Sequence, residues 1–202
     1  MRASTRREFV AGPAGKIECA VDSPSGAARE GKDAARGVAL VAHPHPQFGG
    51  TLDNKVVQTL ARAFVELGYE AWRPNFRGVG ASEGGYDEGK GEVEDLFAVF
   101  NHSNAVVLGG FSFGAAMQVR LSTRVKFERM VLVGVSAAKF ELPPVPAGTI
   151  VIHGERDETV PLAAVLDWAR PQDLPVVLVP GADHFFHRKL HVLRGIVRSS
   201  WK

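Results

Sequence analysis

Cysteine is almost absent from this chain of 202 residues, which contains only Cys19. A lone cysteine cannot form an intramolecular disulfide, and a single thiol is typical of a reducing compartment. Apolar residues alternate around Cys19, a pattern that indicates a small residue within a strand. We therefore expect a cytoplasmic protein.

Long hydrophobic runs are missing as well. No segment approaches the ~18 apolar residues of a membrane helix. The basic start over residues 1–10 leads into no apolar stretch of signal-peptide length. We therefore expect no membrane partner and no signal peptide.

The chain also lacks an excess of charge of either sign. Its 24 Lys and Arg residues nearly balance 22 Asp and Glu residues, which leaves a formal net charge of +2. The basic residues are scattered and form no stripe that could follow a phosphate backbone. This distribution argues against a nucleic-acid partner.

The composition that is present, 45% hydrophobic and 23% charged, is typical of one globular domain, and we expect it to span residues 1–202. From Gly37 onward, solid apolar runs of strand length alternate with segments of helical periodicity. That pattern predicts an α/β fold, with a mostly parallel sheet covered by helices on both faces. The expected strands are 37–43, 70–76, 104–111, 129–136, 148–154 and 175–181, and the expected helices are 54–69, 93–102, 114–122, 161–170 and 187–201.

The segment before Gly37 has a different pattern. Residues 7–24 read as two short strands joined by a turn at 12–15, and we expect them to form an antiparallel edge of the sheet. Residues 25–37 are small and charged without an apolar face, which predicts a loop.

Ligands of such sheets bind beyond the carboxyl ends of the strands, so the strand ends were searched for unusual residues. The run Gly110-Phe111-Ser112-Phe113-Gly114 lies between a predicted strand and a predicted helix and fits G-x-S-x-G. The two glycines allow a sharp, strained turn that exposes the hydroxyl at the top of the sheet. Ser112 is therefore the candidate nucleophile; the alternative is a helix-capping serine between packing glycines.

A second strand end supplies a candidate acid. Asp157 follows the predicted strand 148–154 and precedes a helix, where a carboxylate can orient an imidazole. Glu155 and Glu158 are competing acids, and Asp157 is also compatible with an ordinary turn. We favour Asp157.

A third strand end supplies a candidate general base. His184 follows the last predicted strand by a short loop, whereas His187 and His191 are expected within the closing helix. The chain order of Ser112, Asp157 and His184 is the serine–acid–histidine order of one class of hydrolases. This order favours His184 as general base and then general acid.

The segment after the first parallel strand is a candidate for stabilising a reaction intermediate. Pro44 and Pro46 have no backbone N–H, which leaves His45 and Gln47 as possible donors. Phe113, directly after the candidate nucleophile, would supply the second N–H of an oxyanion hole.

These motifs together resemble the α/β-hydrolases, and more narrowly a group of short bacterial members with an "HPHPxxGG" segment followed by "NKVV". The resemblance extends over nearly the whole chain from about Gly12. It implies the α/β-hydrolase fold and the catalytic triad Ser112, Asp157 and His184, with no cofactor or metal. Residues 137–148 are too few and too proline-rich for a cap domain, so we expect an open site. Its expected substrate-binding residues are Phe48, Gly49 and Phe185, with Phe113 and Phe140 as further apolar walls.

The expected function is a serine hydrolase that cleaves small-molecule carboxylic esters of small or medium acyl groups through an acyl-enzyme. A thioesterase or a peptidase-type serine hydrolase is one alternative, and a non-catalytic binding protein on the same fold is another. We expect a monomer or a homodimer. A metal site is a further alternative, although no H-E-x-x-H pattern is present; its candidate ligands are His43, His45, His153, His184, His187 and His191.

Overall fold

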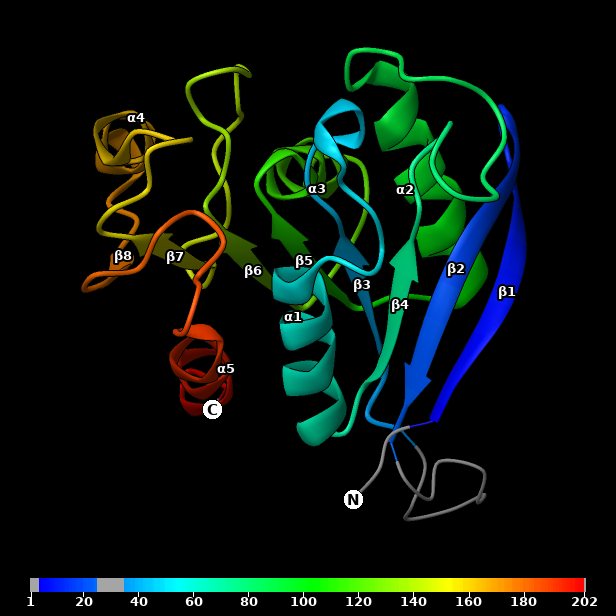
Figure 1. The fold of residues 1–202 in the computed structure, drawn as a ribbon, viewed down its shortest axis with the longest axis horizontal. Coiled ribbons are helices and arrows are strands. Elements are labelled where there is room, and N and C mark those ends of the chain that lie inside the picture. Colours follow the sequence, from blue (N-terminus) through cyan, green and yellow to red (C-terminus); the bar gives the residue numbers. More distant parts are fainter. Residues whose placement is uncertain (1–3, 25–34, 202) are drawn as a thin grey trace.

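A computed structural model describes residues 4–24 and 35–201 and contains one eight-stranded sheet in the order β1-β2-β4-β3-β5-β6-β7-β8 (Figure 1). The pairs from β4 to β8 are parallel, whereas β2 is antiparallel to both β1 and β4. The mostly parallel sheet and its antiparallel N-terminal edge are therefore as the sequence predicts. The strands are β1 (Ser4–Gly12), β2 (Gly15–Ser23), β3 (Val38–Ala42), β4 (Glu70–Pro74), β5 (Val107–Phe111), β6 (Arg129–Val133), β7 (Ile150–Gly154) and β8 (Val176–Val179).

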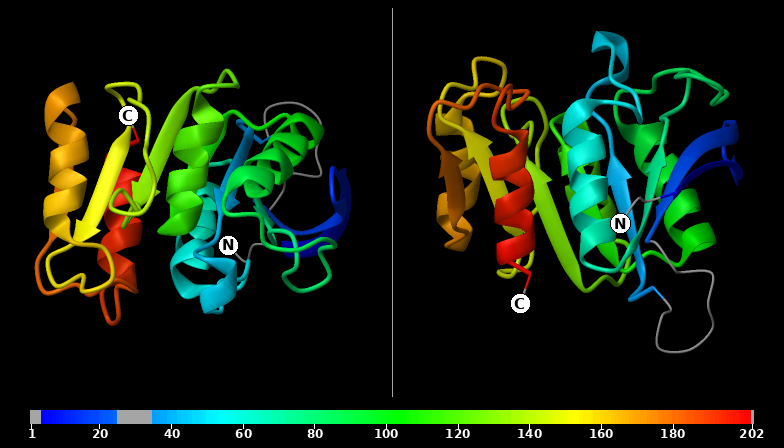
Figure 2. Two further views of the ribbon diagram at one scale, coloured as in Figure 1. Left: turned by 90° about the horizontal axis from the view of Figure 1, so that it is seen from above. Right: turned by 60° about the horizontal axis from the view of Figure 1, so that its bottom comes forward.

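Helices cover both faces of this sheet, because each central strand is apolar on both sides. Figure 2 shows α1 and α5 side by side on one face, where they contact each other and share a buried cluster with β3, β5 and β6. The helices α2, α3 and α4 cover the opposite face. The helices are α1 (Lys55–Glu66), α2 (Lys90–Ser103), α3 (Phe113–Ser122), α4 (Leu162–Ala169) and α5 (Leu190–Ser199), with short 3-10 turns η1 (Pro46–Phe48) and η2 (Arg170–Gln172).

Element boundaries follow local chemistry. The Asn54 side chain accepts hydrogen bonds from the N–H groups of Val56 and Val57 and so begins α1. Asn104 in the left-handed conformation ends α2, which delays the start of β5 to Val107 instead of the expected 104. Most of the predicted loop 25–37 lies outside the described residues.

No cap domain interrupts the sheet. The connection between β6 and β7 contains turns at 137–139 and 147–148 but no helix or strand. The carboxyl ends of β3, β5, β6 and β7 consequently share one uncovered edge. Among the described residues, no helix is both long and apolar enough to cross a membrane.

Candidate active site

Ser112 sits in the tight turn between β5 and α3. Its φ of 55° lies in the left-handed region that non-glycine residues rarely occupy. Main-chain hydrogen bonds hold the turn, since the Ser112 N–H donates to the Val133 carbonyl and its carbonyl accepts from the Ala116 N–H. The neighbouring strand β6 and the following helix therefore impose this strained conformation and direct the hydroxyl toward the carboxyl edge of the sheet.

The glycines flanking this turn are required by close approach. A Cβ at Gly110 would lie 2.6 Å from the backbone of Ala115, and a Cβ at Gly114 would lie 2.4 Å from the His43 carbonyl oxygen. Real Cβ atoms do not approach backbone so closely. A larger residue at Gly110 would therefore push α3 away from β5, and one at Gly114 would push α3 away from the end of β3.

Three side chains from separate strand ends meet at this edge. His184 Nε2 lies 3.1 Å from Ser112 Oγ, and His184 Nδ1 lies 2.7 Å from Asp157 Oδ2. Because an ionised carboxylate can only accept, Nδ1 carries the proton and Nε2 is left to accept from the serine hydroxyl. The tautomer is thus the one that can take a proton from Ser112.

Asp157 is held as a charged acceptor. Its side chain is fully buried, and Oδ1 accepts hydrogen bonds from the N–H groups of Thr159 (2.9 Å) and Val160 (2.8 Å). Burial alone raises the pKa of Asp157, but the hydrogen bonds from His184 and Val160 outweigh it, and the pKa lies below its ordinary value. The carboxylate therefore stays ionised and fixes the imidazole.

The competing residues lie elsewhere. Glu155 is exposed and accepts a hydrogen bond from the Gly181 N–H, while Glu158 is also exposed. His187 is exposed and pairs with Asp183. None of these side chains contacts Ser112 or His184.

Two further residues lie at the site: Ser136, which stands in no motif of the sequence, and His153, which the sequence offers only as a candidate metal ligand. Ser136 lies beyond the end of β6, is buried, and places its Oγ 3.3 Å from Ser112 Oγ. The buried His153 lies on β7, with Nε2 3.7 Å from Asp157 Oδ2 and 3.1 Å from the Val160 carbonyl oxygen. Both could have been found by applying the strand-end search to β6 and to inward-facing polar residues of β7.

The segment after β3 folds back on itself beside Ser112. The Gly50 N–H donates to the His45 carbonyl oxygen, and a Cβ at Gly50 would lie 2.0 Å from the Pro44 carbonyl oxygen. The Gln47 N–H donates to His45 Nδ1, so that amide already has a partner. Within residues 4–24 and 35–201, the N–H of His45 has no hydrogen-bond acceptor, and His45 lines the pocket whereas Gln47 does not.

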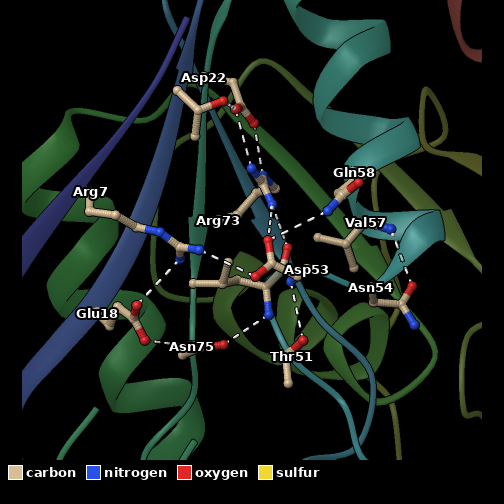
Figure 3. Close-up of polar contacts among 12 residues, drawn as sticks. Arg7, Glu18, Asp22, Thr51, Asp53, Asn54, Val57, Gln58, Arg73 and Asn75 are labelled. Atoms are coloured by element: carbon tan, nitrogen blue, oxygen red, sulfur yellow. Dashed lines mark hydrogen bonds and ion pairs between the residues drawn. The ribbon is translucent and has the colours of Figure 1, made fainter. Parts of the chain in front are cut away.

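A polar clamp beneath this segment fixes its position (Figure 3). The buried Arg73 on β4 pairs with Asp22 on β2 at 2.8 Å and donates to the Leu52 carbonyl oxygen at 2.5 Å. The Asn75 side chain accepts from the Leu52 N–H at 2.8 Å and donates to Glu18 at 2.7 Å. Both backbone polar groups of Leu52 are therefore held by side chains at the end of β4, which anchors the loop carrying His45.

Ser112 opens into a cavity of about 290 Å³. Phe48 and Gly49 line one side, and Phe185 lines another; Phe48 is 77% exposed and Phe185 is 44% exposed. Phe113 is buried below and packs against Phe140. The remaining lining residues are Pro44, His45, Gly50, Asn54, Ser136, Ala138, Lys139, Thr159, Val160 and His184.

Two of the histidines considered as metal ligands, His43 and His153, are buried on hydrogen-bond partners of their own. His43 is buried between the Pro44 carbonyl oxygen (2.6 Å from Nδ1) and the Phe76 N–H (3.0 Å from Nε2). In the part of the chain that the structure describes, no three His, Cys, Asp or Glu side chains form a cluster that could hold a metal ion.

No protein-family model matches this chain, but individual known proteins are similar to it. The chain is 34% identical over 174 residues to the uncharacterised protein RP471 of Rickettsia prowazekii (strain Madrid E), which covers 75% of this chain and 73% of that protein. The crystal structure of XC6422 from Xanthomonas campestris, a member of the α/β serine hydrolases without a lid, matches with a TM-score of 0.85 and 35% identity, covering 99% of this chain and 94% of that one. An α-β serine hydrolase homologue from Coxiella burnetii matches with a TM-score of 0.82 and 35% identity, covering 98% and 97%.

Proposed function

Because this chain belongs to the α/β serine hydrolases that lack a lid, we propose that it hydrolyses carboxylic esters of small or medium acyl groups. The observation that carries this proposal is the continuous contact from Asp157 through His184 to Ser112 at the floor of the cavity. A carboxylate, an imidazole and a hydroxyl that contact one another in this order form the catalytic triad of acyl-transfer enzymes.

In the proposed reaction, Ser112 Oγ attacks the ester carbonyl while His184 Nε2 takes its proton. His184 then gives this proton to the departing alcohol, which leaves an acyl group on Ser112. A water molecule next gives a proton to His184 and attacks the acyl carbonyl. His184 then returns this proton to Ser112 Oγ as the bond to the acyl group breaks and the acid leaves. Asp157 stays ionised throughout and stabilises the imidazolium.

We assign the oxyanion hole to the backbone N–H groups of Phe113 and His45. Phe113 is the first residue of α3, so its N–H has no partner within the helix. His45 is favoured over Gln47 because the Gln47 N–H is already bonded. Each donor contributes roughly 2.7–4 kcal/mol to transition-state stabilisation, by comparison with other hydrolases.

Two features of the cavity favour small or medium esters. Its volume of about 290 Å³ is at the lower end of ligand sites. It is also open to solvent, because no cap covers it, and offers few groups to grip and protonate a poor amine leaving group. Phe48, Gly49 and Phe185 are the proposed substrate contacts.

The test is a panel of nitrophenyl esters, thioesters and amides of graded acyl length. We expect hydrolysis of short and medium esters by the wild type and its loss in Ser112→Ala. Ser122→Ala is the matched control, since Ser122 lies at the far end of α3 and donates only to the Val119 carbonyl oxygen. Persistent turnover in Ser112→Ala would refute the nucleophile.

The same panel separates the alternatives. Faster turnover of thioesters or amides than of esters would indicate a thioesterase or a peptidase-type enzyme. Absence of turnover for every substrate would favour a binding protein on this fold.

A further inference from the structure

Within residues 4–24 and 35–201, Lys139 is the only Lys, Arg, Asp or Glu that lines the cavity at Ser112. It lies three residues beyond Ser136 on the loop that follows β6, and its N–H donates to the Ser136 carbonyl oxygen at 3.3 Å. This hydrogen bond fixes the loop that carries Lys139 against Ser136, which lies beside Ser112. The position of Lys139 at the pocket therefore follows from the sheet.

The ammonium group of Lys139 lies near a second lining residue of the cavity. Its Nζ is 5.6 Å from the centre of the Phe48 ring, which also lines the cavity. Lys139 also lowers the pKa of His45, as a second cause after burial, which indicates that its charge acts on the oxyanion side of the pocket. A cation–π contact with an exposed ring contributes only about 0.5–1 kcal/mol, so the ammonium can readily turn to an anion.

Among the described residues, no carboxylate forms an ion pair with Lys139, and none lines the cavity. The N-terminus of α3 adds a partial positive charge at the cavity floor, and the Arg120 guanidinium lies 5.0 Å from the ring centre of the pocket residue Phe140. The ionised Asp157 lies behind His184 and outside this lining, so the Lys139 ammonium is the charged group at the cavity wall that can meet an anionic substrate.

We propose that Lys139 selects esters that carry a free carboxylate, which binds its ammonium group while Ser112 attacks the ester carbonyl. This inference rests on the proposed esterase function and narrows its substrate class. A neutral ester would still react, because Lys139 takes no part in the proton transfers.

The experiment compares a nitrophenyl monoester of adipic acid with the nitrophenyl ester of hexanoic acid, which has the same chain length and no charge. A third ester, carboxynitrophenyl hexanoate, places the anion on the leaving alcohol. We expect wild-type kcat/KM to favour at least one anionic ester over its neutral counterpart. Lys139→Met should reduce the ratio of kcat/KM for the anionic ester to kcat/KM for the neutral ester about fivefold, as removing a partly exposed ion pair would.

Two controls sharpen this test. Lys126→Met removes an exposed lysine that does not line the cavity and should leave the preference intact. High salt should weaken the wild-type preference, because the screening length falls to about 3 Å at 1 M.

Failure of the inference and failure of the function give different results. Hydrolysis of neutral esters without an anionic preference, or with a preference that Lys139→Met leaves unchanged, would overturn the role of Lys139 alone. Loss of all ester hydrolysis in the wild type would overturn the proposed function.

Discussion

Ser112 occupies a backbone conformation that costs roughly 1–3 kcal/mol. The cost is met by its surroundings, because the Val133 carbonyl oxygen and the Ala116 N–H both hold its main chain. The hydroxyl itself contributes little to the fold, since its contacts are to Ser136 and His184. The geometry therefore supports a nucleophile kept in place for chemistry and not for stability.

A substitution at Asp157 tests the orientation of the imidazole. Asp157→Asn can donate a hydrogen bond toward Nδ1 and so stabilises the tautomer with the proton on Nε2, which cannot accept from Ser112. We expect kcat for a nitrophenyl ester to fall by about 10⁴-fold, as in other triads.

The matched control for Asp157→Asn is Glu155→Gln. This change keeps an oxygen that can accept from the Gly181 N–H, and we expect ordinary turnover. Severe loss in Glu155→Gln with normal turnover in Asp157→Asn would show that the acid is wrongly assigned.

Some residues at the site could not be found from the sequence. Ser112, Asp157 and His184 stand in recognisable local patterns at strand ends, and the structure brings these three together. Ser136, Asn75 and Arg73 stand in no such pattern, because their positions depend on which strands are neighbours. Lys139 reads as an ordinary exposed lysine in the sequence, and only the structure places it beside Phe48 in the lining of the cavity.

At the scale of elements, the close packing of α3 against β3 sets the turn at Ser112. Gly114 permits this packing, since a Cβ there would contact the carbonyl oxygens of His43 and Ala42 at 2.4–2.5 Å. Backbone atoms on both sides cannot yield as a flexible side chain would. The short distance between α3 and β3 therefore helps to set the geometry of the site, together with its side chains.

We expect Gly114→Ala to lower the free energy of unfolding by about 1–3 kcal/mol, the usual cost of overpacking. Ester hydrolysis should fall as well, because α3 must move away from the oxyanion side. Chemical unfolding and a nitrophenyl ester assay measure the two effects.

Gly195→Ala serves as the control for this substitution. A Cβ at Gly195 would meet no atom within 4 Å, and the residue lies within α5. Alanine should therefore raise the free energy of unfolding by about 1 kcal/mol through helix propensity. Equal effects of the two substitutions would contradict the packing argument.

The order and type of the main elements were predictable, because apolar runs and helical periodicity alternate clearly after Gly37. Short elements were not. The turn η1 contains three residues, which are too few to show any periodicity. Its Pro46 is compatible with the start of a helix but does not by itself predict one. The strand order of the sheet also lies beyond local patterns, since neighbours such as β3 and β5 are distant in the sequence.

On the scale of the whole molecule, the sheet buries histidines in neutral form. His43 is fully buried, donates from Nδ1 to the Pro44 carbonyl oxygen, and accepts from the Phe76 N–H at Nε2. Burial lowers its pKa from 6.5 to about 4, and a proton on Nε2 would also face the Phe76 donor. The pKa of His153 is lowered by burial as well.

This burial predicts a loss of stability in mild acid. Between pH 6.5 and about 4 the unfolded chain binds a proton at His43 that the folded chain does not, so the free energy of unfolding falls as pH falls. The contribution of His43 is roughly 3 kcal/mol across this range. Urea unfolding at several pH values measures it.

A comparison with His43→Gln separates this effect from that of carboxylates, whose protonation destabilises both proteins alike. The glutamine amide can donate and accept but does not ionise. We expect the stability difference between wild type and variant to shrink as pH falls from 6.5 to 4. A difference that stays constant across this range would contradict the assignment.

The strained turn, the packing of α3 and the fold of the sheet all bear on the reactivity of Ser112 Oγ. The measurement that tests it most directly is reaction with a serine-directed fluorophosphonate, followed by intact mass and peptide mapping. We predict a single adduct on Ser112, its absence in Ser112→Ala, and much slower formation in His184→Ala. Absence of an adduct in the wild type, or its attachment to another residue, would show that Ser112 is not an activated nucleophile.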